Sequence, residues 1–139
     1  MKKYIRIIAS LSFIMVALFS ACDFINKPLR EKMQRYYSVD ANYRELEGNI
    51  VSIDYTMIEI NITTPNHDIP YGDCVKFRFY GDMECLNEIQ AGDCITFISA
   101  PYYFYNGHDL PIVALEKDGE VLLSFEDGKR NLLSWVETF

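Results

Sequence analysis

The alternation of side chains over residues 57–63 constrains the fold more than any other feature of the chain. Ile58, Ile60 and Ile62 fall on one face of this stretch, and Met57, Glu59, Asn61 and Thr63 fall on the other. A period of two is typical of a β-strand with one buried and one solvated face. The chain is therefore expected to contain a sheet whose inner face is apolar.

Similar patterns mark further strands on both sides of this stretch. In residues 74–80, Val75, Phe77 and Phe79 point inward while the basic residues between them point outward. Gly48 is expected to mark a bulge in the strand before residue 57. The other strand-like segments are residues 49–55, 94–99, 110–116 and 121–125. The sequence thus predicts five to six strands.

Two segments change from the strand period to helical spacing. In residues 82–90, Met83, Leu86 and Ile89 share one stripe behind Asp82, a residue that can cap a helix. In residues 129–139 an i, i+3, i+4, i+7 stripe predicts a short closing helix. That stripe consists of Leu132, Trp135, Val136 and Phe139. Trp135 is expected to face the core as an anchor.

The order of these elements, with three strands before a short helix and two or three strands after it, resembles the OB-fold. That family is a small Greek-key β-barrel with a helix between strands three and four. The resemblance covers residues 43–125, with Gly48 in the first strand and Gly92 and Asp93 before the fourth. It implies a mainly β chain, with a barrel of five to six strands and a C-terminal helix. A small β-sandwich with two short helices is the alternative.

The N-terminus has the composition of an export signal. Lys2, Lys3 and Arg6 precede an apolar run over residues 7–19, and the polar part of the chain begins directly after Cys22. A basic start, an apolar stretch and a junction of small residues are typical of a secretory signal peptide. A retained transmembrane helix is disfavoured, because residues 7–21 number 15 and a bilayer needs about 20 apolar residues.

The junction Ser20-Ala21-Cys22 resembles the lipobox of bacterial lipoproteins, in which the cysteine is acylated and the signal is cut ahead of it. It departs from that pattern at Phe19, where the family more often has Leu. The resemblance implies a signal peptide over residues 1–21 and lipidation of Cys22. The membrane would then be a partner through this lipid. The domain would lie outside the cytoplasm, on the cell membrane or the outer membrane.

Residues 22–42 are expected to form a lipidated tether with a short helix, ahead of the domain at residues 43–139. Asn26 can cap this helix, and Pro28 suits an early helical position. Leu29 and Met33 then share a stripe with Tyr36 or Tyr37. We favour a stripe that packs onto the domain. The alternative is a helix lying in the membrane interface with help from its basic residues.

The net charge of the expected mature chain limits the classes of partner that it can bind. All 20 acidic residues and 10 of the 13 basic residues lie after residue 21, so residues 22–139 carry a net charge of −10. Because such a surface repels phosphate backbones, a nucleic-acid partner is not expected. Anionic lipids would not attract the domain either, so the acyl chains would have to hold it at the membrane.

Residues 101–109 contain the clearest candidate for a binding surface. Four consecutive aromatic residues, 102–105, cannot all be buried by a strand with one solvated face. In the OB-fold this stretch is the loop between strands four and five, which often contributes to the ligand face. The candidate contacts are Tyr102, Tyr103, Tyr105, Asn106, His108 and Asp109. Alternatively, the rings pack on the C-terminal helix or pair across a hairpin that turns at Asn106-Gly107.

The two histidines occur in similar phrases, His67-Asp68 and His108-Asp109, each followed two residues later by proline. Such pairs can bind a metal or act as an oriented general base, but turn chemistry explains them equally well. We expect the two loops to lie near opposite ends of the barrel, which separates the pairs. No catalytic residue, metal site or cofactor is therefore assigned.

Three cysteines remain after Cys22, namely Cys74, Cys85 and Cys94. The sequence leaves open whether two of them form a disulfide, since spacing does not determine connectivity. No C-x-x-C motif is present, so neither a redox motif nor a zinc ribbon is indicated.

These observations favour a non-enzymatic role. We expect a membrane-anchored lipoprotein whose domain binds a protein, a peptide or a glycan in the cell envelope. The alternatives are a small hydrolase that uses a His–Asp pair and a purely structural envelope protein.

Overall fold

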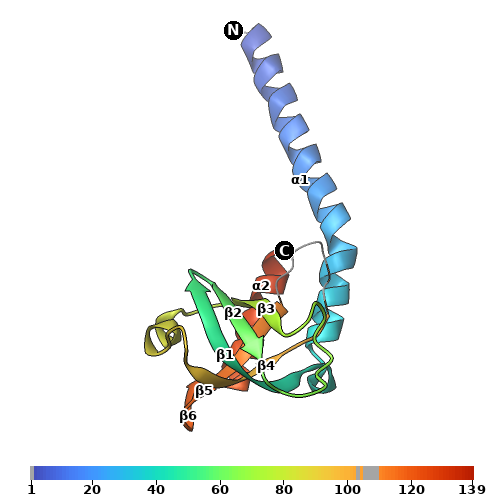
Figure 1. The fold of residues 1–139 in the computed structure, drawn as a ribbon. Coiled ribbons are helices and arrows are strands. Elements are labelled where there is room, and N and C mark those ends of the chain that lie inside the picture. The colour runs from blue at the N-terminus through green and yellow to red at the C-terminus, as the bar shows by residue number, and fades with distance from the viewer. Residues whose placement is uncertain (1, 103, 105–109) are drawn as a thin grey trace.

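A β-barrel forms the centre of the molecule, and a long N-terminal helix projects from it (Figure 1). The computed structural model describes residues 2–102, 104 and 110–139, and within the first helix it describes the side chains of residue 12, residues 14–18 and residues from 26 onward. The strands are β1 (Arg44–Asp54), β2 (Met57–Ile62), β3 (Cys74–Phe79), β4 (Cys94–Ser99), β5 (Leu110–Lys117) and β6 (Glu120–Leu123). The helices are α1 (Lys2–Tyr37) and α2 (Phe125–Thr138), with 3-10 turns η1 (Asp40–Asn42) and η2 (Glu84–Glu88).

One sheet closes on itself to make the barrel. Antiparallel pairing gives the strand order β3-β2-β1-β4-β5, and β3 then pairs in parallel with β5, with Phe77 opposite Leu110 and Phe79 opposite Ile112. β6 adds to β5 as an extra strand. The predicted barrel, with a short helical turn between β3 and β4 and a C-terminal helix, is confirmed. The β-sandwich alternative is wrong, because a single closed sheet encloses the core.

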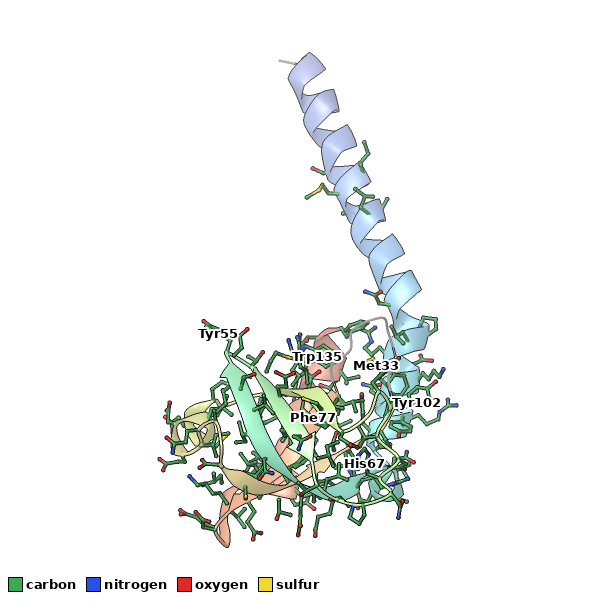
Figure 2. The ribbon with its side chains drawn as sticks, in the orientation of Figure 1. Met33, Tyr55, His67, Phe77, Tyr102 and Trp135 are labelled. Atoms are coloured by element: carbon green, nitrogen blue, oxygen red, sulfur yellow. The ribbon has the colours of Figure 1, made fainter. Side chains whose placement is uncertain are left out.

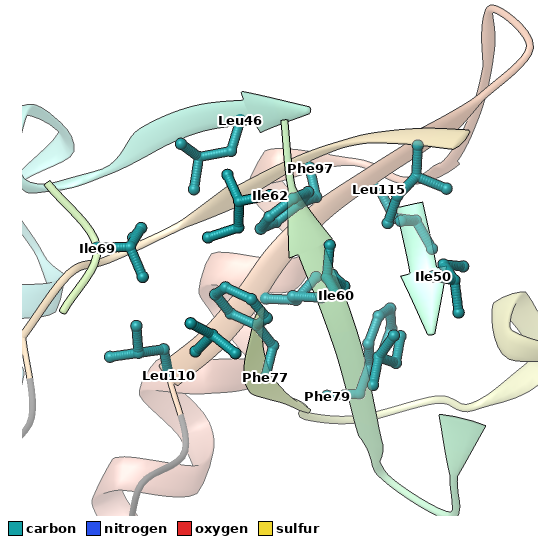
Figure 3. Close-up of a cluster of buried hydrophobic side chains, with 14 of the residues drawn as sticks. Leu46, Ile50, Ile60, Ile62, Ile69, Phe77, Phe79, Phe97, Leu110 and Leu115 are labelled. Carbon is teal, nitrogen blue, oxygen red and sulfur yellow. The ribbon is translucent and has the colours of Figure 1, made fainter. Parts of the chain in front are cut away.

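The alternation in β2 positions the barrel core as predicted. Ile58 and Ile60 are fully buried, and Phe77 from β3 meets Phe97 from β4 with ring centroids 5.0 Å apart. Figure 3 shows the side chains of Ile60, Phe77 and Phe97 converging inside the barrel. Burial of these large apolar side chains is the main stabilisation of the barrel.

A bulge in β1 interrupts the alternation of its side chains. The pairing with β2 shifts between Ile50 and Ser52, so Val51 and Ser52 are both exposed and Ile53 packs against the core. The extra residue reverses the face on which later side chains lie. The bulge thus falls after Gly48 rather than at it. Gly48 instead allows a close approach of β2, because a Cβ there would lie 2.4 Å from Cγ2 of Ile60.

A second core lies outside the barrel, between β5, α2 and the end of α1. Val113 points out of β5 and is fully buried with Leu132 and Val136 of α2. Met33 and Tyr37 of α1 complete this cluster at 1% and 5% exposure. The favoured interpretation of the tether stripe is therefore confirmed, and a helix lying flat in the membrane interface is excluded for these two buried residues.

The helix boundaries differ from those expected. α1 is one continuous helix of 36 residues that includes Pro28, whereas the sequence predicted a short helix beginning near Asn26. Apolar residues such as Leu and Met are good helix formers, so the stretch ahead of Asn26 continues the helix. Within the described part of the chain, no helix is long and apolar enough to cross a membrane.

The other two helical segments are also shifted. η2 is a five-residue 3-10 turn rather than a nine-residue helix, and its N-cap is Met83 rather than Asp82. Asp82 precedes the cap and accepts a hydrogen bond from the backbone N–H of Glu84 at 2.9 Å. α2 begins at Phe125, four residues before the predicted start. Ser124 is its N-cap and accepts a hydrogen bond from the backbone N–H of Asp127 at 3.2 Å, a signal that the sequence reading missed.

Candidate binding surface

An aromatic surface forms where the loop after β4 meets the end of α1. The ring centroid of Tyr102 lies 5.3 Å from that of Tyr36 and 4.7 Å from that of Phe104. Phe104 also meets the ring of Tyr37 at 5.3 Å, which joins the loop to the second core. Figure 2 shows Tyr102 beside this part of α1. With 43% of its surface exposed, Tyr102 presents an aromatic ring to solvent on a fixed base.

Lys32 adds a cation to this aromatic surface. Its Nζ lies 5.7 Å from the ring centroid of Tyr102 and 6.0 Å from that of Phe104. Both distances are within the range of cation–π attraction. The residues Lys32, Tyr36, Tyr102 and Phe104 are called the aromatic surface below.

An ion pair borders the aromatic surface. Nε of Arg44 donates to Oδ2 of Asp68 at 2.9 Å. Burial raises the pKa of the Tyr36 hydroxyl, Arg44 lowers it in part, and Asp68 and Tyr102 raise it. The Tyr36 hydroxyl therefore stays protonated at neutral pH and can donate a hydrogen bond. The border thus offers charged groups and a hydroxyl beside flat apolar rings.

Of the six predicted contact residues, the structure describes Tyr102 alone. Tyr103, Tyr105, Asn106, His108 and Asp109 lie outside the described residues, as does the Asn106-Gly107 turn signal. Tyr102 and Phe104 both stack on tyrosines of α1. Phe104 also packs against the second core, which includes Leu132 and Val136 of α2, so the alternative in which the rings pack on the C-terminal helix is retained for Phe104. Tyr36, Lys32 and Arg44 were missed, since nothing in the sequence indicates that a segment some 65 residues earlier lies under the loop.

The two halves of His67-Asp68 have different partners. Nε2 of His67 lies 3.1 Å from Oδ1 of Asp73, whereas Asp68 pairs with Arg44. The His67 side chain is only 8% exposed, and its buried Nδ1 has no hydrogen-bond partner among the described residues. The His67 side chain thus has little access to solvent, whereas the Asp73 side chain that it pairs with is 76% exposed.

The structure describes only part of the two histidine loops. Asp68, from the loop after β2, pairs with Arg44, and Tyr102, from the loop after β4, packs on Tyr36 of α1. The expectation that the two loops lie at opposite ends of the barrel stays a prediction. Whether the second pair meets the first depends on His108 and Asp109, which lie outside the described residues.

A shallow groove of about 370 Å³ lies elsewhere, on the outer face of β1, β2 and β3. Its walls are formed by Ser52, Asp54, Met57, Glu59, Lys76 and Arg78. Glu59 lies between Ser52 and Lys76 in the strand register and accepts a hydrogen bond from the Ser52 hydroxyl at 3.1 Å. The outward direction of Lys76 and Arg78 was predicted from the alternation in β3, but the groove was not.

The three cysteines after Cys22 are unpaired. Cys74 is in β3 and Cys94 is in β4, and these strands are not neighbours, because β2 and β1 separate them on one side of the barrel and β5 on the other. The structure shows no disulfide among the three cysteines, which answers the question that the sequence left open.

Acidic residues gather beside η2, where Asp82, Glu84, Glu88, Glu120 and Asp127 line a hollow of about 560 Å³. Asp127 accepts hydrogen bonds from Ser124 and Arg130, which lower its pKa. Within residues 2–102, 104 and 110–139, no three His, Cys, Asp or Glu side chains are placed to hold a metal ion.

Comparison of the chain with the models of known protein families, with curated proteins and with solved structures finds no match.

Proposed function

We propose that this protein is a lipid-anchored binding module of a bacterial cell envelope. Cys22 carries the lipid, the signal over residues 1–21 is removed, and the domain binds a protein, a peptide or a glycan through the aromatic surface. The domain lies outside the cytoplasm, on the cell membrane or the outer membrane.

The anchor is supported by the sequence of the first 22 residues. A basic start, an apolar run and a small-residue junction end at a cysteine, and the chain becomes polar directly afterwards. Mass spectrometry of the mature N-terminus tests this part. A peptide that begins at an acylated Cys22 is expected, and an intact Met1 or an unmodified Cys22 would reject the anchor.

The barrel is further proposed to be an OB-fold. This finer assignment is supported by the strand order, in which β1 is central between β2 and β4 and the barrel closes through a parallel pair of β3 and β5. The OB-fold uses loops at one end of the barrel, including the one between strands four and five, for ligands. In this chain that loop carries Tyr102.

The exposed ring of Tyr102 is the observation that carries the binding role. An exposed tyrosine offers an apolar face and a polar tip, which suits sugars and protein surfaces. Here the ring is held by Tyr36 and Phe104 and has a cation above it, so little conformational entropy is lost on binding. A nucleic acid is not proposed as the ligand, because the strongly acidic mature chain would repel its phosphate backbone.

The binding role is tested by comparing how well the wild type and Tyr102→Ala retain components of an envelope extract. Affinity for the retained component, measured separately with the peptide, protein and glycan fractions, is expected to fall at least about fivefold, since central aromatic contacts contribute more than about 1 kcal/mol. Tyr55→Ala is the matched control, because Tyr55 is 91% exposed at the tip of the β1–β2 hairpin. Equal losses in both variants would reject the aromatic surface as the contact.

A His–Asp hydrolase is the second candidate, because Nε2 of His67 lies 3.1 Å from Oδ1 of Asp73. The low exposure of the His67 side chain makes this residue a poor general base for a substrate that arrives from solvent. Ester or amide hydrolysis that is lost in both His67→Ala and Asp73→Asn would favour this candidate. A purely structural envelope protein is the third, and light scattering that shows a stable oligomer without a ligand would favour it.

A further inference from the structure

We propose that the domain sits on the lipid surface in one orientation, with the end from which α1 projects facing the phospholipid headgroups. This inference rests on the proposed acylation of Cys22. The exit face is defined by Lys27, Tyr55, Trp135 and Phe139, which lie at that end of the domain. Figures 1 and 2 show the C-terminus, Tyr55 and Trp135 at the end of the barrel nearest the projecting helix, and β6 at the opposite end.

The distance from the anchor to the domain is short. α1 contacts the end of α2 at Asn26, whose Nδ2 donates to the carbonyl oxygen of Phe139 at 3.3 Å. Cys22 and Asn26 are both in α1, four residues apart, which corresponds to about 6 Å along a helix. The headgroup region on each side of a bilayer is about 5–8 Å thick. A lipid on Cys22 therefore brings Phe139 to the level of the headgroups.

The connection between the lipid and the domain is stiff. From Met33 onward α1 is fixed in the second core, with Met33 and Tyr37 buried and the Tyr43 hydroxyl donating to the carbonyl oxygen of Tyr37 at 2.7 Å. A helix attached in this way does not let the domain rotate freely beneath its anchor, as a flexible linker would. The buried side chains are also unavailable to the membrane, so contact with lipid falls to the exit face.

The side chains of the exit face suit a headgroup layer. Trp135 and Phe139 are half-buried, with ring centroids 5.5 Å apart, and Trp135 also packs on Tyr80 at 4.7 Å. Tyr55 is 91% exposed at the tip of the β1–β2 hairpin, and the Lys27 side chain is 66% exposed. Trp and Tyr are enriched at membrane–water interfaces, where an apolar ring and a polar tip are both satisfied. Lys27, whose Nζ lies 4.0 Å from Oε1 of Glu31, offers an exposed ammonium group to lipid phosphate.

Trp135 is the single tryptophan, so its fluorescence reports on the exit face of the unaltered protein. The acylated protein is purified in detergent and reconstituted into phosphatidylcholine vesicles, with or without a nitroxide on the lipid headgroup. Loss of Trp135 emission that increases with the nitroxide fraction is expected. Protein that floats with the vesicles and keeps its full emission would overturn the orientation while leaving the anchor intact.

Two probe variants locate the contact. In a Trp135→Phe background, Tyr55→Trp moves the fluorophore to the hairpin tip, and Val121→Trp moves it to β6, where Val121 is 61% exposed at the opposite end. Quenching is expected at position 55 and not at position 121. Equal quenching at both positions would overturn the proposed orientation. A mature N-terminus without an acyl group and without flotation would reject the anchor and, with it, the orientation.

Discussion

At the scale of single residues, the carboxylate of Glu59 controls the thiol of Cys74. Desolvation raises the pKa of Cys74, and the charge of Glu59 and its hydrogen bond with Sγ, at 3.6 Å, raise it further. A raised pKa leaves less thiolate at a given pH, and the thiolate is the reactive form. Glu59→Gln is therefore expected to increase the rate of alkylation of Cys74 at pH 8 by about two- to tenfold.

Cys94 provides the internal control for this experiment. Its Sγ donates to Oδ1 of Asn49 at 2.8 Å rather than to Glu59. Peptide mapping after a timed reaction with iodoacetamide separates the two cysteines in the same sample. An unchanged rate at Cys74, or an equal increase at Cys94, would contradict the role assigned to Glu59.

Asp93 makes the fold sensitive to acid. Its Oδ2 accepts hydrogen bonds from Nζ of Lys117 at 2.7 Å and from the backbone N–H of Gln90 at 2.8 Å, and these lower its pKa. A lowered pKa in the folded state stabilises the protein above the unfolded value of about 3.9, and this contribution is lost as the pH falls below it. Asp93→Asn is thus expected to destabilise the protein at pH 7.

The pH dependence distinguishes this effect from a general loss of packing. The difference in unfolding free energy between wild type and Asp93→Asn, from urea titrations, should shrink as the pH falls below about 4. A difference that stays constant from pH 7 to pH 3 would contradict the assignment of the effect to the charge of Asp93.

At this scale the sequence could predict the exposure of aromatic residues in the candidate site but not their contacts. The sequence predicted that at least two of four consecutive rings reach the surface or a neighbouring element, because a strand with one solvated face cannot bury all four. Tyr102, at 43% exposure, is one of them. Its partners Tyr36 and Lys32 come from a helix about 65 residues earlier. A ring-to-ring contact of that kind depends on how α1 packs, and no local pattern contains this information.

At the scale of elements, Gly128 sets how closely α2 approaches β5. A Cβ at this position would lie 2.0 Å from the carbonyl oxygen of Val113, which is part of a strand backbone and cannot move aside. A Gly→Ala change inside a helix normally stabilises by about 1 kcal/mol. Here we expect the opposite sign, a loss of roughly 1–3 kcal/mol or more, because α2 must shift away from the barrel.

Ser134→Ala is the matched control for Gly128→Ala, since Ser134 is on the exposed side of the same helix. Its effect is expected to stay within about 0.5 kcal/mol. Urea unfolding of the three proteins measures both values. A Gly128→Ala protein at least as stable as the wild type would show that α2 does not pack against β5 as closely as described.

The elements differ in how much of them local sequence determines. The inward and outward faces of β2 were predicted, because apolar and polar side chains alternate along it without interruption. β1 was placed only in part, because the bulge between Ile50 and Ser52 reverses its inward face and arises from pairing with β2. The end of α1 was recognised as a packing stripe from Met33 and its neighbours. Its continuity through Pro28 was not, because Pro28 looks like a helix start when read alone.

At the scale of the whole molecule, the barrel and the end of α1 form one folded unit. The barrel core is closed by β3 and β5, but the outer side of β5 is covered only when α1 and α2 come together over Val113. Nζ of Lys129, on α2, donates to the carbonyl oxygen of Ser38 at 3.0 Å and pairs with Asp40. The sequence-based boundary at residue 43 was drawn where the side-chain period becomes two, but the second core includes residues on both sides of it.

This packing predicts where the chain can be shortened. A chain that begins at residue 26 keeps Met33 and Tyr37 and should be as stable as one that begins at residue 22. A chain that begins at residue 43 loses both buried side chains, at a cost of roughly 5–10 kcal/mol. A domain of this size has only about 5–15 kcal/mol of stability, so this shorter chain should be largely unfolded at 25 °C. Urea titrations followed by circular dichroism compare the three chains, and a stable, cooperatively folded chain from residue 43 would contradict the prediction.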